Sequence, residues 1–147
     1  MQRWVEAGRL RRHRTTPREI GDLLAVAARD LADAHVSATS IDRRFATAYS
    51  AALQLATVVL AASGYRVSAQ RGHHAVTIQA LPELLGPGAT PLADFLDSCR
   101  TLRNTSDYDR VGAVTERDLA ELLDEVERFR RQALDWLTSA HPKLLSK

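Results

Sequence analysis

Apolar residues recur along most of the chain at the three- and four-residue spacing of helices, and short polar or glycine-containing segments interrupt this pattern. Alanine and leucine dominate while strand-forming runs are scarce, so we expect an all-α fold. The pattern predicts four long helices and one short helix, joined by brief loops as an antiparallel bundle. We detect no internal repeat and no domain linker in the sequence.

Threonines that suit the N-cap position mark three helix starts, at Thr16, Thr90 and Thr115. The first two are followed by proline, which is favoured at the first helical position. Another long helix is expected from Ser40 or Asp42 to Ser63. The short helix is expected around residues 75–85, where Pro82 implies a break, a kink or a fresh start.

The helix that ends near Ser63 is apolar on two sides. Such a helix lies at the centre of a bundle or also meets a partner subunit. We therefore predict a homodimer. We expect no membrane-spanning segment and no signal peptide, and thus a cytoplasmic protein.

The chain divides into a basic N-terminal arm over residues 1–15, a helical bundle domain over residues 16–140 and a C-terminal tail over residues 141–147. The arm is rich in arginine although the net charge of the whole chain is only +2. It can contact nucleic-acid phosphates, or it can form a solvated tail or a short helix that docks through Trp4, Val5 and Leu10.

Several kinds of chemistry lack their usual motifs. His73 and His74 are adjacent, so on a helix their side chains point about 100° apart and do not share a metal ion. The glycines lack the spacing of phosphate-binding loops, and Cys99 fits a buried apolar position better than a nucleophilic one. We therefore predict no metal and no cofactor.

One polar stripe stands out on the helix that follows Pro91. It comprises Arg100, Arg103, Asn104, Asp107 and Tyr108. Helical spacing places most of these side chains on one face, where guanidinium, amide and phenol groups suit a phosphate. The alternative is a surface ion pair between Arg103 and Asp107 at the helix end.

Histidine and arginine together suggest RNA cleavage. A histidine can abstract the 2′-hydroxyl proton, and an arginine can stabilise charge on the phosphorane. His73 and His74, which open the short helix, are therefore candidate bases beside Arg103.

The segments Tyr49 to Ala52, Gly64 to Arg66 and Gly72 to His74, followed by Arg100, Arg103, Asn104 and Tyr108, occur in an order that resembles the HEPN domains (higher eukaryotes and prokaryotes nucleotide-binding). The resemblance extends over about residues 19–137. It implies an all-α bundle that dimerises. It also implies a place in a bacterial toxin–antitoxin or anti-phage module, where a small nucleotidyltransferase commonly serves as the antitoxin.

Ribonuclease members of this family carry an arginine, a polar residue directly after it and a histidine a few residues later. Arg103 and Asn104 match the first half, but Tyr108 or Asp109 stands where the histidine belongs. A phenol is a poor base at neutral pH. We therefore favour a non-cleaving subunit that binds RNA or a nucleotide, over a ribonuclease that uses His73 or His74 and over a plain protein-interaction subunit.

Overall fold

The computed structural model describes residues 1–68, 72–108 and 113–145; the side chains of residues 105–108 also lie outside this description. Helices dominate the described residues, and the all-α expectation is confirmed apart from one pair of short strands. The α-helices are α1 (Gln2–Glu6), α2 (Pro17–Ala34), α3 (Ile41–Ala62), α4 (His73–Gln79), α5 (Leu81–Leu85), α6 (Thr90–Tyr108) and α7 (Glu116–Ala140). The strands are β1 (Leu10–Arg12) and β2 (Tyr65–Val67), and short 3-10 helices span Pro87–Ala89 and Pro142–Leu145.

Side-chain caps begin three of the long helices. The Thr16 hydroxyl accepts the Glu19 backbone N–H at 3.2 Å, and the Ser40 hydroxyl caps α3 in the same way. At α7, Thr115 and Asp118 exchange hydrogen bonds between side chain and backbone, which satisfies two N–H groups at once. Each cap fixes a helix start where the sequence places it.

Thr90 does not act as the predicted cap. Its φ of −58° and ψ of −44° are helical, and the 3-10 turn Pro87–Ala89 leads directly into α6. A helix entered from such a turn needs no extended capping residue. Of the three outcomes expected at Pro82, the structure has a fresh start, because α4 ends at Gln79 and α5 begins at Leu81.

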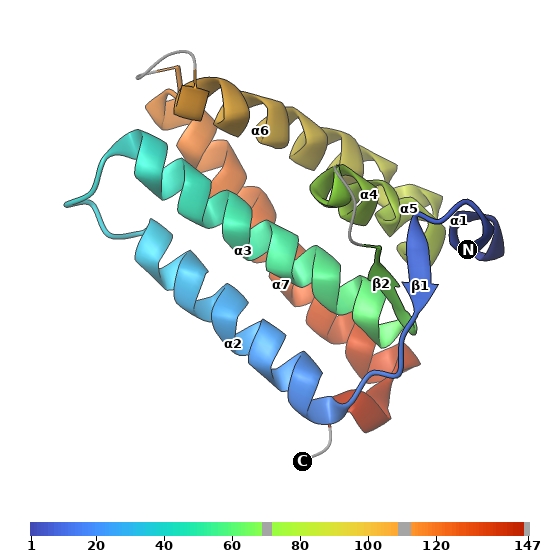
Figure 1. Cartoon of the computed structure of the whole chain (residues 1–147). Coiled ribbons are helices and arrows are strands. Elements are labelled where there is room, and N and C mark those ends of the chain that lie inside the picture. Colours follow the sequence, from blue (N-terminus) through green and yellow to red (C-terminus); the bar gives the residue numbers. More distant parts are fainter. Residues whose placement is uncertain (69–71, 109–112, 146–147) are drawn as a thin grey trace.

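Helix α3 is the central element of the bundle (Figure 1). It packs against α2 on one side and against α7 and α6 on the other, while α4, α5 and β2 also contact it. Its buried side chains include Phe45, Tyr49, Leu55 and Val59. Both apolar sides of α3 are therefore covered within one chain, which is the first of the two alternatives that the sequence left open.

The same helix is long and apolar enough to cross a membrane by length and composition alone. However, 67% of its most apolar window is buried inside the bundle. A core helix passes the same composition test as a membrane span, and the packing of α3 accounts for its apolar character.

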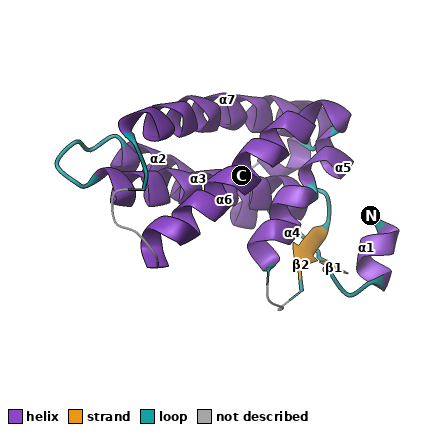
Figure 2. Cartoon of the chain, turned by 90° about the horizontal axis from the view of Figure 1, so that it is seen from above, coloured by secondary structure: helices purple, strands orange, loops and turns teal. Residues whose placement is uncertain are grey.

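The N-terminal segment packs along the bundle. Strand β1 pairs antiparallel with β2, a strand that directly follows α3. Leu10 is 1% exposed and lies in a small apolar cluster with Leu60 and Ala80. Figure 2 shows α1 and the strands beside α4, on the side of the bundle away from α7.

Candidate functional site

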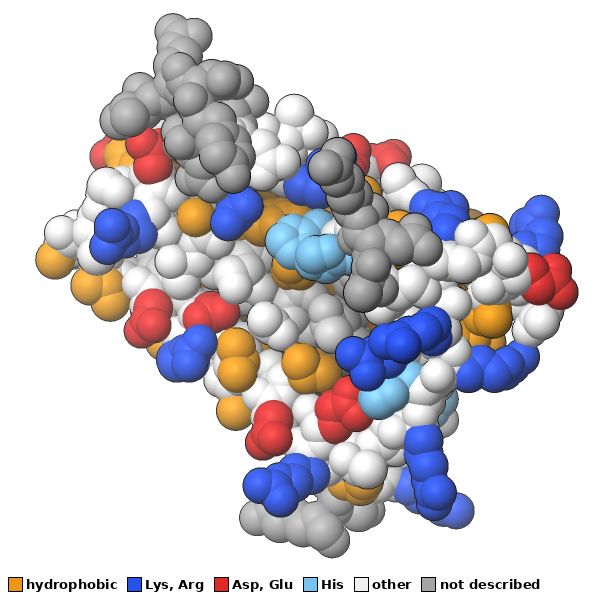
Figure 3. All heavy atoms as spheres, viewed as in Figure 1, with side chains coloured by type: hydrophobic (Ala, Val, Ile, Leu, Met, Phe, Trp, Pro, Cys, Tyr) orange, Lys and Arg blue, Asp and Glu red, His pale blue; other side chains and the backbone are white. Residues whose placement is uncertain are grey.

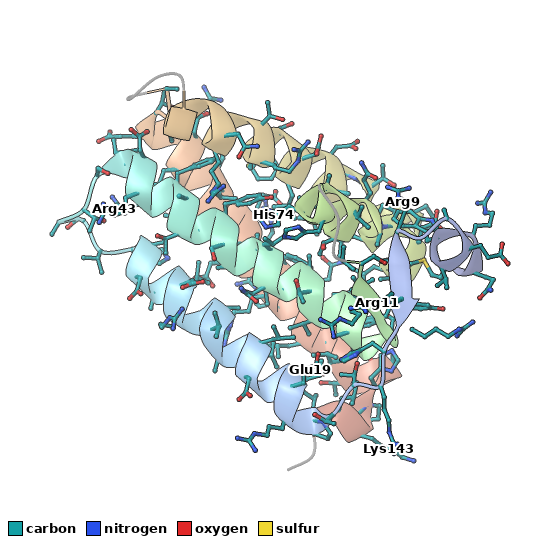
Figure 4. The ribbon with its side chains drawn as sticks, in the orientation of Figure 1. Arg9, Arg11, Glu19, Arg43, His74 and Lys143 are labelled. Carbon is teal, nitrogen blue, oxygen red and sulfur yellow. The ribbon has the colours of Figure 1, made fainter. Side chains whose placement is uncertain are left out.

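Four side chains from three helices meet where α3, α4 and α6 come together. They are Tyr49 of α3, His74 of α4, and Arg100 and Arg103 of α6. The Arg103 guanidinium carbon lies 5.8 Å from the centre of the Tyr49 ring, and the His74 ring centre lies 6.4 Å from that same Tyr49 ring centre. Figure 4 shows His74 at this junction. The fold therefore brings a predicted histidine and the predicted arginines together.

Tyr49 forms the buried floor of this site. Only 2% of the residue is exposed, and its hydroxyl has no hydrogen-bond partner among the described residues. Burial raises the pKa of the phenol to about 12, although the charges of Arg100 and Arg103 act in the opposite direction. The hydroxyl therefore stays protonated at neutral pH and is available as a hydrogen-bond donor.

His74 lies in a positive environment. Partial burial lowers its pKa from the ordinary value of 6.5, and His73, Arg103 and Arg100 lower the pKa further. The His73 ring stands edge-on to the His74 ring, with centres 4.5 Å apart. His74 is therefore a neutral imidazole at pH 7, the form that can accept a proton.

The predicted stripe on α6 is only partly described. Arg100 pairs with the Asp97 carboxylate at 3.0 Å, which offsets part of its charge, and Asn104 is exposed to solvent. The side chains of Asp107 and Tyr108 lie outside the described residues. Arg103 therefore provides the firmest link between the stripe and the histidines.

Because the pKa of His74 is lowered in the folded protein, we expect the free energy of unfolding to depend on pH through this residue. Between the unfolded pKa near 6.5 and the lower folded pKa, the unfolded chain takes up the proton first, so stability falls as the pH falls. We expect the free energy of unfolding of His74→Gln to decline less than that of the wild type between about pH 7 and pH 5. Urea titrations at several pH values measure this, with exposed His35→Gln as the control; identical pH profiles of wild type and His74→Gln would contradict it.

Sequence reasoning did not single out Tyr49 as a site residue, because its position fits the apolar stripe of α3. The signal was a phenol within a run of alanines and leucines, since a tyrosine in a core position carries a hydroxyl that needs a partner.

Within the described part of the chain, no group of three or more His, Cys, Asp or Glu side chains is placed to hold a metal ion.

Comparison with known proteins identifies the family of this chain. Residues 34–133 match the HEPN_SAV_6107-like HEPN family, which covers more than half of the chain and includes Tyr49, His74, Arg100 and Arg103. The chain belongs to the HEPN family. No curated protein and no solved structure matches it. Membership indicates a function that involves nucleotides or RNA.

Proposed function

We propose that the protein is a HEPN subunit that binds RNA or a nucleotide through the junction of α3, α4 and α6 without cleaving it. The observation that carries the proposal is the meeting of Arg103 and His74 over the buried, unpartnered hydroxyl of Tyr49. Arginine supplies charge-assisted hydrogen bonds to phosphate oxygens, and a neutral histidine and a phenol add further donors. Asn104, Asp107 and Tyr108 belong to the same proposed surface on α6.

Arg103→Ala tests this proposal. Loss of charge-assisted contacts worth about 1.5–3 kcal/mol weakens RNA binding by about 10- to 150-fold. Fluorescence anisotropy with labelled single-stranded RNA measures the affinity. Arg43→Ala is the matched control, because Arg43 is an exposed arginine in the first turn of α3, at the other end of the bundle from the strands (Figure 4). Equal affinities of the wild type and Arg103→Ala would overturn the proposal.

A metal-independent ribonuclease is the second candidate, and the position of His74 favours it. The neutral imidazole would accept the proton of a ribose 2′-hydroxyl while the 2′-oxygen bonds to the adjacent phosphorus. The 5′-oxygen would leave and take a proton from water, and Arg103 would stabilise the charge on the phosphorane. His73, in ring contact with His74, is the alternative base.

The ribonuclease and the non-cleaving subunit are distinguished by what they leave of the RNA. The ribonuclease leaves a 2′,3′-cyclic phosphate and a 5′-hydroxyl, whereas a binding subunit leaves total RNA intact. Inducible expression in a bacterial host, with growth and RNA integrity followed together, distinguishes the two. Cleavage that persists in a variant lacking both His73 and His74 would exclude this mechanism.

The resemblance also supports a cellular setting. We propose a homodimer that works in a bacterial toxin–antitoxin or anti-phage defence module, with a nucleotidyltransferase-type antitoxin as its partner. Light scattering that shows a monomer at micromolar concentration would exclude the dimer. Failure of a neighbouring gene product to co-purify with the chain or to neutralise its effect would exclude the partner.

A further inference from the structure

A pocket lies next to the candidate site. It has a volume of about 340 Å³ and lies between β2 and helices α3 and α4, near the start of α2. Its apolar wall includes Leu60 and Val67, and its polar lining includes Thr57, Arg66 and His73. This volume falls within the range of small-ligand pockets, about 300–1,000 Å³.

Two arginines on the strands form an unfavourable pair of like charges, and one of them, Arg66, lines the pocket. Arg11 of β1 and Arg66 of β2 are direct partners in the antiparallel register, and both are exposed. Like charges directly opposite each other destabilise a strand pair. Among the described residues, no ion pair is shown to either arginine, and the one carboxylate that lines the pocket, that of Glu19, contacts His13 at 2.7 Å. The two arginines therefore present uncompensated positive charge.

The pocket and the candidate site share a boundary. His73 lines the pocket, and its ring contacts His74, whose pKa responds to Arg103 and Arg100. On the face shown in Figure 3, histidine side chains lie close to lysine or arginine side chains in two places, and at one of them an acidic side chain lies directly beside the histidine. A ligand that spans both places meets positive charge at each end.

We propose that this pocket, with the Arg11–Arg66 pair, is a second subsite that takes a nucleobase and a neighbouring phosphate of single-stranded RNA. The inference rests on the proposed function and narrows its ligand from a nucleotide to a polynucleotide. The aromatic rings of Tyr65 and His73 in the lining suit stacking with an unpaired base. A base held in a duplex cannot enter a pocket without being extruded, which costs energy. Single strands are therefore the preferred ligand.

The double variant Arg11→Gln/Arg66→Gln tests the subsite in the full chain. Each lost phosphate contact should reduce the slope of log affinity against log salt by about 0.7, and single-stranded RNA binding should weaken at least tenfold. A nucleoside monophosphate should still bind at the Arg103 site of this double variant, and should compete with RNA there as well as it does in the wild type. The matched control is Arg29→Gln/Arg43→Gln, which removes two exposed arginines that line a different pocket.

Thr57→Leu provides an independent test by filling the pocket without changing charge. It should also weaken binding of labelled single-stranded RNA, and short duplex RNA should bind the wild type more weakly than the single strand does. The subsite would be overturned if the arginine double variant kept the RNA affinity and the salt slope of the wild type. It would also be overturned if the wild type bound duplex RNA as tightly as single-stranded RNA. If these tests exclude the subsite but Arg103→Ala still weakens RNA binding, the proposed function is retained without the subsite.

Discussion

Phe129→Ala is expected to lower the free energy of unfolding by about 3–5 kcal/mol, the usual cost of truncating a buried phenylalanine. Phe129 is 1% exposed and belongs to the main core cluster on α7, the helix that packs along α3. Truncation removes apolar contacts and leaves a cavity that a close-packed bundle fills only in part. Because domains are stable by about 5–15 kcal/mol, this single change removes a large fraction of the total.

Urea denaturation followed by circular dichroism measures this loss. Gln132→Ala is the control, since Gln132 is exposed on the same helix and alanine has a higher helix propensity. A loss below about 1 kcal/mol for Phe129→Ala would mean that α7 contributes little to the core, because such small changes are typical of surface positions.

The helical part of the fold follows closely from local signals. The caps at Thr16 and Thr115 act within one turn of the chain, and the start of α2 and both bounds of α3 agree with the expected ones. At Thr90 the local signal predicted the wrong role, because the conformation of this residue depends on the 3-10 turn before it. The same sequence feature, a threonine before a proline, has two outcomes in this chain.

The strand pair could not be predicted in the same way. Leu10 pairs with Val67, far away in the sequence, and each strand has only three residues. Such short strands have no measurable alternation of polar and apolar residues, so only tertiary contact selects them. The N-terminal arm places Leu10 in a buried cluster, as the docking alternative in the sequence implied, and Arg11 at the surface; the strand that carries both residues was not indicated by the sequence.

The candidate site was half visible in the sequence. Arg100 and Arg103 stood out because they share a helix, but their proximity to His74 arises from the packing of α4 beside α6. Tyr49 completes the group from a third helix, where its pattern was that of a core residue. Local spacing reveals side chains on one element, whereas a site built from three elements depends on packing that the sequence does not display.

Tyr49→Phe is expected to raise the free energy of unfolding by about 1–3 kcal/mol, because it removes a buried hydroxyl that lacks a hydrogen-bond partner among the described residues. The ring remains in place, so the packing against α4 and α6 is preserved. We expect the same variant to bind RNA more weakly than the wild type, because the hydroxyl is the donor that a phosphate oxygen would use once Arg103 and His74 move to admit it. A polar group kept at a cost to stability is typical of functional sites.

Thermal or urea unfolding and RNA anisotropy on the same preparations separate the two effects. Tyr65→Phe is the control for stability alone, because Tyr65 also carries a phenol but is only partly buried, so the free energy of unfolding of this variant should change little. Higher stability with unchanged RNA affinity would show that the Tyr49 hydroxyl takes no part in binding and would leave Arg103 and His74 as the core of the site. Lower stability would show that the Tyr49 hydroxyl already has a hydrogen-bond partner and is not an unsatisfied donor.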